Sequence, residues 1–135
     1  MQHYQLFESP QLPQHYLVNS SFFEDSEFLI YDKTNGDAAA TFIDYPFISP
    51  QKTVAVSFAA SISYDEGTAI MQLQTIRGGT FSFIFATEFI GWNIPNKKVI
   101  YWLSENTFIL KVKEVEDNYS SEENAKFFYL KFTLK

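Results

Sequence analysis

Alternation of apolar and polar residues dominates the chain. The stretch KTVAVSFAASISY, from Lys52 to Tyr64, places large apolar residues on one side and small, mostly polar residues on the other. A period of two is typical of a β-strand, because successive side chains of a strand point to opposite faces. The same pattern predicts strands at Thr68–Arg77, Thr80–Ile90, Val99–Ser104, Thr107–Val115 and Lys126–Leu134, and weaker ones at Phe28–Lys33, Ala38–Asp44 and within His15–Phe23.

The segments between these strands are short and rich in turn residues. Asn35-Gly36 is a strong hairpin signal, Asp65-Glu66-Gly67 suits a three-residue loop, and Gly78-Gly79 suits a two-residue loop. No helix, repeat or linker is evident, so residues 1–135 are expected to form one all-β domain. Open sheet edges are a hazard, so an antiparallel meander of eight or nine strands should close or pack. We expect a closed barrel rather than a two-sheet sandwich.

The loop lengths predict which residues share a face of the sheet. The two-residue loop sets Gln74 opposite Phe83 and Gln72 opposite Phe85, and the three-residue loop sets Phe58 opposite Gln74. Both pairings gather the same large residues on one face: Val54, Val56, Phe58, Ile62, Tyr64, Ile70, Ile76, Phe81, Phe83, Phe85 and Phe89. A one-residue slip would mix the two faces, so the agreement between the hairpins supports this register.

Gln72 and Gln74 are polar residues in the middle of this apolar face. A buried amide without a partner costs about 1–3 kcal/mol, so each glutamine should have a partner, reach solvent or line a cavity. Apolar walls with a few polar groups are typical of a ligand pocket. The pattern therefore predicts a site for a hydrophobic small molecule, in which the two glutamines are the polar groups. Its walls and rim would be Phe58, Tyr64, Phe81, Phe83, Phe85, Trp92 and Trp102.

The glutamines have a simpler interpretation. They would bond each other or the backbone inside a sandwich core, or the register would be slipped.

Candidate catalytic residues are few. Glu88 is the only carboxylate in the apolar run Thr80–Ile90, and a carboxyl with a raised pKa could act as a general acid or base. A surface carboxylate with Arg77 on the same face is the simpler interpretation. His3 and His15 lie outside the best strands, and neither a Ser-His-acid arrangement nor a cluster of metal ligands is apparent. Whether the protein is an enzyme therefore stays open, and no cofactor or metal is expected.

One stretch resembles a known class of barrels. The segment LIYDKTNGDAAATF, followed by long hairpins that turn at Asp65-Glu66-Gly67, is similar in rhythm to small eight-stranded barrels of the calycin (lipocalin) and allene-oxide-cyclase kind. The Gly-x-Trp typical of lipocalins near the N-terminus is absent. The resemblance implies a lumen that binds an apolar small molecule and could promote cyclisation or isomerisation by holding a substrate in shape.

Composition narrows the partners and the location. The chain has 16 acidic and 10 basic residues and a net charge of −6, so neither a nucleic acid nor an anionic membrane surface is expected as a partner. No cysteine is present, which excludes disulfide scaffolds and thiolate metal sites. No signal-peptide pattern opens the chain and no apolar run reaches the roughly 20 residues of a membrane helix. A soluble cytoplasmic protein is expected, while a secreted origin stays open.

The second functional hypothesis is an acidic protein-interaction module. In this case the phenylalanine row is ordinary core, and a basic protein binds to edge strands and to the acidic loops Glu24–Glu27 and Glu114–Glu123, as for an inhibitor or immunity-type protein. Exposed edges would then favour a homodimer. A third hypothesis is a sugar-binding sandwich with aromatic side chains on a flat face.

Overall fold

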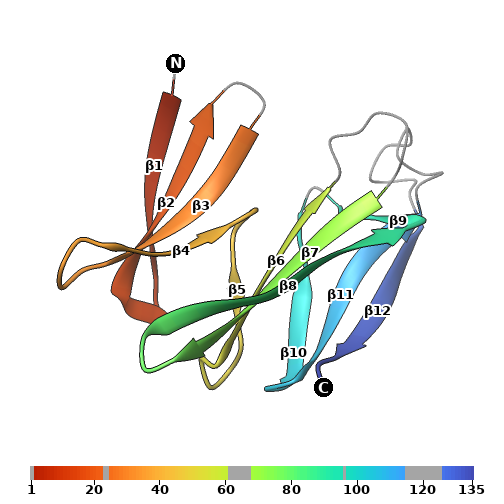
Figure 1. The fold of residues 1–135 in the computed structure, drawn as a ribbon. Helices are drawn as coiled ribbons and strands as arrows, with labels where there is room; N and C mark the ends of the chain where they lie inside the picture. The colour runs from red at the N-terminus through yellow and green to blue at the C-terminus, as the bar shows by residue number, and fades with distance from the viewer. Residues whose placement is uncertain (1, 23–24, 61–67, 96, 115–125) are drawn as a thin grey trace.

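The computed structural model describes residues 2–22, 25–60, 68–95, 97–114 and 126–135, and every regular element in them is a β-strand (Figure 1). The strands form three antiparallel sheets, each built from one continuous part of the chain. Sheet A contains β1 (Gln2–Ser9), β2 (Leu12–Phe22), β3 (Asp25–Asp32) and β4 (Ala38–Phe42). Sheet B contains β5 (Phe47–Ile48), β6 (Val54–Ala60), β7 (Thr68–Arg77) and β8 (Thr80–Ile90). Sheet C contains β9 (Trp92–Asn93), β10 (Ile100–Ser104), β11 (Thr107–Glu114) and β12 (Phe127–Thr133).

Sheet B is the middle layer, with sheet A on one side and sheet C on the other (Figure 1). Alternate residues of β6 and β7 point to the two sides, and each side is buried in its own core. The core between sheets A and B is formed by Leu12, Leu17, Phe28, Ile30, Phe42, Ile48, Ala55 and Ile76. The core between sheets B and C is formed by Val56, Phe58, Ala69, Met71, Leu73, Ile94, Phe108, Leu110 and Val112.

The all-β prediction is confirmed, and the predicted strands coincide with β2, β3, β4, β6, β7, β8, β10, β11 and β12 apart from their ends. Strand β1 was not predicted. Among the described residues the strands form three separate sheets, and no closed barrel is found. The barrel prediction therefore stays unconfirmed.

The β7–β8 hairpin confirms its predicted turn but not its whole register. Gly78 and Gly79 have φ angles of 57° and 79°, the left-handed conformation that a tight hairpin turn requires, and Gln74 pairs with Phe83 as expected. A β-bulge then inserts Ile84 as an extra residue, so Phe85 pairs with Leu73 and Gln72 pairs with Ala86. The prediction that Gln72 lies opposite Phe85 was wrong because strand alternation cannot reveal a bulge.

The predicted register between β6 and β7 was also wrong. Phe58 pairs with Met71, three positions away from the expected Gln74. The expected loop, residues 65–67, lies outside the described residues, and the last paired positions on either side of it are Ala60 and Ala69. The observed pairing places apolar residues opposite apolar ones, which keeps one whole face of the hairpin in the core. An offset of three positions moves both glutamines to the opposite face from Phe58.

Gln72 and Gln74 join sheet B to the end of β4. The Gln72 side-chain oxygen accepts a hydrogen bond from the Ile43 backbone N–H at 3.0 Å. The Gln74 amide donates to the Thr41 carbonyl oxygen at 2.9 Å, and the Gln72 amide donates to the same oxygen at 3.3 Å. The simpler interpretation, in which the glutamines bond backbone groups in a packed core, agrees with these contacts.

Glu105 joins sheet C to sheet B. It lies in the turn between β10 and β11, and its carboxylate accepts hydrogen bonds from the Ser49 hydroxyl at 2.7 Å, from the Thr53 hydroxyl and from the Gln51 backbone N–H, all between β5 and β6. Burial by itself would raise the pKa of Glu105. The hydrogen bonds outweigh burial and hold this pKa below its usual value of 4.5.

Replacing Gln72 by leucine should destabilise the protein by about 1–3 kcal/mol, because the Ile43 N–H loses its acceptor at the interface between sheets A and B. Urea unfolding of Gln72→Leu measures this change. Gln14→Leu is the control, since Gln14 is exposed on β2 and should change stability by less than about 0.5 kcal/mol. Equal stability of the two variants would contradict a structural role for the glutamine bonds.

Glu105→Gln should make unfolding less dependent on pH. Because the folded state lowers the pKa of Glu105, the carboxylate stabilises the protein above about pH 4.5, and this stabilisation is lost as the pH falls through the folded-state pKa. Urea unfolding between about pH 3 and pH 6 should show a shallower slope for Glu105→Gln than for wild type. The exposed Glu88 is the matched control, and a Glu88→Gln variant with the same loss of slope would refute the assignment.

Candidate functional site

The predicted phenylalanine wall is divided between different parts of the molecule. Phe58 is fully buried between sheets B and C, with its ring 5.9 Å from that of Phe108. Phe81 packs instead against the core between sheets A and B. Phe83 and Phe85 are 60% and 37% exposed, and the bulge at Ile84 pairs them with residues on opposite faces of β7. The structure therefore does not bring these four rings together on one face.

The remaining predicted pocket residues have structural partners or lie outside the described residues. Gln72 and Gln74 bond the backbone after and within β4, as described above. Trp92 and Trp102 are half-buried at the edge of the B–C core, with ring centroids 5.2 Å from Phe128 and 5.1 Å from Phe108, respectively. Tyr64 lies outside the described residues, as do Glu24 and residues 115–123 of the two predicted acidic loops.

Glu88 is exposed on β8, opposite Ile70. Arg77 is at the other end of the same hairpin, about 23 Å away at the rise per residue of a strand. Glu88 lies on the face of Ile70, and Arg77 lies on the opposite face of β7, so the prediction that the two charges share a face was wrong. The surroundings of Glu88 are those of a surface carboxylate.

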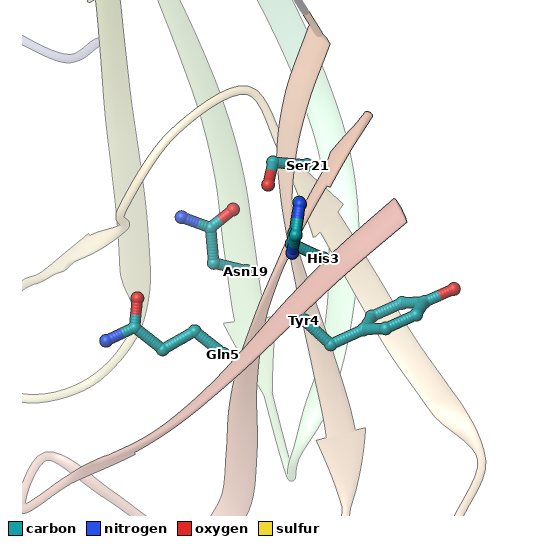
Figure 2. Close-up of a pocket in the computed structure, with 5 residues that line it drawn as sticks. All are labelled: His3, Tyr4, Gln5, Asn19 and Ser21. Atoms are coloured by element: carbon teal, nitrogen blue, oxygen red, sulfur yellow. The ribbon is translucent and has the colours of Figure 1, made fainter. Parts of the chain in front are cut away.

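A shallow polar hollow lies on β1 and β2, with a volume of about 270 Å³ (Figure 2). Its lining residues are His3, Tyr4, Gln5, Asn19 and Ser21. Figure 2 shows His3, Gln5 and Asn19 on one side of the strands and the Tyr4 ring on the other. The Asn19 side-chain oxygen accepts a hydrogen bond from the Ser26 hydroxyl at 2.9 Å. None of the described residues that line the hollow is a carboxylate that could orient His3, so they do not complete a Ser-His-acid triad.

The outer face of sheet A has many apolar side chains for a face that none of the other described sheets covers. Here the outer face means the side of β1–β3 that points away from sheet B, with the apolar residues Tyr4, Leu6, Tyr16, Val18, Phe22, Leu29 and Tyr31. Strand pairing aligns Leu6, Val18 and Leu29 in one row across three strands. Tyr4 and Leu6 are 66% and 61% exposed. This face therefore exposes apolar groups to water, with the polar Ser20 and Glu27 between the Leu6 row and Phe22.

Two carboxylates, Glu8 and Glu27, lie on the outer face beside this apolar row. On the outer face Glu8 forms an ion pair with Lys33 at 2.9 Å, and Lys33 lies 4.6 Å from the centre of the Tyr16 ring. Glu27 is exposed and lies two residues before Leu29, on the same face of β3. At the β3–β4 turn, the Thr34 backbone N–H donates to Asp32 at 2.7 Å and lowers the pKa of this carboxyl, which favours its charged form.

The net charge of the protein is concentrated in the same region. Residues 2–45 contain seven carboxylates and one lysine, whereas residues 46–135 contain nine acidic and nine basic residues. The whole net charge of −6 therefore belongs to the part of the chain that forms sheet A.

This surface was missed because β1 was not predicted. A sequence signal exists in QHYQLFE, where Tyr4 and Leu6 alternate with polar residues. It is weak because Phe7, the residue that packs inward, follows an exposed leucine and breaks the simple alternation. The sequence also gives no indication of which side of a strand another sheet covers.

The described residues offer few other sites for chemistry. They contain no group of three or more His, Cys, Asp or Glu residues that could hold a metal ion, and no helix long and apolar enough to cross a membrane. His15 is buried against the Phe81 ring at 5.5 Å. Comparisons with protein-family models, with curated proteins and with solved structures find no match for this chain.

Proposed function

We propose that the protein is a protein-interaction module that binds a basic partner through the outer face of sheet A. The observation that carries this proposal is the apolar row of the exposed Leu6 and the half-buried Val18 and Leu29 in the acidic part of the chain. Antiparallel sheets that contact water usually place polar residues on the solvated face. An apolar face with polar residues at its margin is instead typical of a surface that a partner covers.

The side chains on this face suit a protein partner. Tyrosine is enriched in protein interfaces, because its ring contributes apolar area and its hydroxyl can still bond water or a partner. Glu8 and Glu27 are at the margin, where charges mainly guide association and select partners. A matching surface would have an apolar centre and lysine or arginine around it.

Hydrophobic small-molecule binding in a barrel lumen stays a prediction from the sequence. It depends on a closed barrel and on one face shared by the phenylalanines and the glutamines. Phe58 and the two glutamines lie on opposite faces of sheet B. The contacts of these residues therefore support the small-molecule hypothesis less than the outer face of sheet A supports the interaction module. Whether the protein catalyses a reaction stays open.

Leu6→Asp should remove the interaction without unfolding the protein. An aspartate in the centre of the row would be desolvated when the partner binds, so the amount of captured partner should fall at least about tenfold. Because Leu6 is exposed, the change in stability should stay within about 0.5 kcal/mol. The measurement is quantitative mass spectrometry of proteins that wild-type and variant baits retain from a lysate of the source cells.

Ile84→Asp is the matched control, because Ile84 is a similarly exposed aliphatic residue on sheet B. The proposal expects a basic protein that wild type and Ile84→Asp retain and Leu6→Asp does not. If all three baits retain the same proteins, the outer face of sheet A is not the interaction surface.

A further inference from the structure

The outer face of sheet C has the opposite charge from that of sheet A. Val112 and Leu110 point into the B–C core, so Lys111 and Ile109 point outward from β11. Strand pairing places Tyr101 and Lys131 on either side of Ile109, and Tyr129 beside Lys111. Tyr101 and Tyr129 are 56% and 58% exposed. This face therefore has aromatic and aliphatic groups at its centre and lysines among them.

The strands of the three layers show the same difference in charge. The strands of sheet A contain four carboxylates and no lysine or arginine, and those of sheet B contain one arginine and one glutamate. The strands of sheet C contain three lysines and one glutamate. Within the strands, sheet A is thus acidic and sheet C is basic, with Lys33 paired to Glu8 beside sheet A and Lys113 buried in sheet C.

The two outer faces cannot meet within one chain. Sheet B separates sheet A from sheet C, so the outer faces point away from each other (Figure 1). A second copy can bring them together, because it presents its sheet C to the sheet A of the first. Both surfaces are antiparallel sheets with an apolar centre, and such sheets pack face to face at about 10 Å with their strands about 30° apart.

We infer that the protein associates head to tail, with the outer face of sheet A of one copy packed on the outer face of sheet C of the next. This inference rests on the proposed function and assigns the basic surface of the partner to sheet C of a second copy of the chain. The Leu6 row would pack against Tyr101, Ile109 and Tyr129. Glu8 and Glu27 would lie near Lys111 and Lys131 of the other copy.

Charge selects this arrangement over a symmetric dimer. Packing sheet A on sheet A would bring carboxylates together, and packing sheet C on sheet C would bring lysines together, both of which are unfavourable. A contact between two different faces leaves one free face at each end, so further copies can add. Most of the charged groups are exposed, so salt should weaken the association.

Two variants with one blocked face each provide the test. Tyr4→Asp combined with Leu6→Asp blocks sheet A, and Lys111→Glu combined with Lys131→Glu blocks sheet C. Both sets change residues at the outer surface, and thermal melts confirm that each variant is folded. Sedimentation velocity from about 10 µM to about 1 mM protein, in about 0.05 M and about 0.5 M NaCl, measures the assembly state.

Wild type should grow beyond a dimer as its concentration rises, and should dissociate at the higher salt concentration. Each blocked variant alone should be a monomer. An equal mixture should form one-to-one dimers and nothing larger, because each variant supplies the one intact face that the other lacks. A monomeric wild type, a monomeric mixture, or a dimer of either blocked variant alone would overturn the inference.

The lysate experiment separates this inference from the proposed function. If wild type is monomeric but still captures a basic protein that Leu6→Asp loses, the head-to-tail contact is wrong and the interaction module stands. If wild type is monomeric and captures no such protein, both are wrong.

Discussion

Both faces of β6 and β7 are buried, one of them lined by large apolar residues and the other by Ala55 and Ile76 beside the polar Ser57 and Gln74. Val56 and Phe58 need a cover on one side, while Ala55 and Ile76 need a cover on the other. A single sheet packed against sheet B could cover only one of these faces. Sheet A and sheet C cover the two sides separately, and the three-layer arrangement follows from this requirement.

The contacts between layers use polar groups at the margins of the cores. Gln72 and Gln74 bond backbone groups at Thr41 and Ile43, where β4 ends. Glu105 collects donors from the segment between β5 and β6. These bonds are directional, so they fix how the layers are placed on one another, whereas apolar burial alone would allow them to slide.

The strands were predictable because alternation depends on neighbouring residues alone. The Gly78-Gly79 turn was predictable for the same reason, since two glycines suit two left-handed positions. The register was not predictable beyond the bulge, because Ile84 is an ordinary strand residue whose extra position depends on its partner strand. One such insertion reverses the face of each residue that follows, and the predicted pocket depended on those faces.

The candidate surface was even less accessible from the sequence. Alternation shows that Leu6 and Phe7 lie on opposite sides of a strand, but it does not show which side another sheet covers. Phe7 packs into the A–B core and Leu6 faces water, although both are large and apolar. That difference is set by sheet B, whose residues lie about 40 or more positions later in the chain.

The order of the sheets along the chain has a consequence for biosynthesis. A ribosome completes β1–β4 before it makes β6 and β7, which cover Leu17 and Ile30. For that interval the nascent sheet A has apolar groups on both faces, and its own strands cannot bury either one. The growing chain is therefore most vulnerable to aggregation before sheet B emerges, and a chaperone that shields β1–β4 would act in that interval.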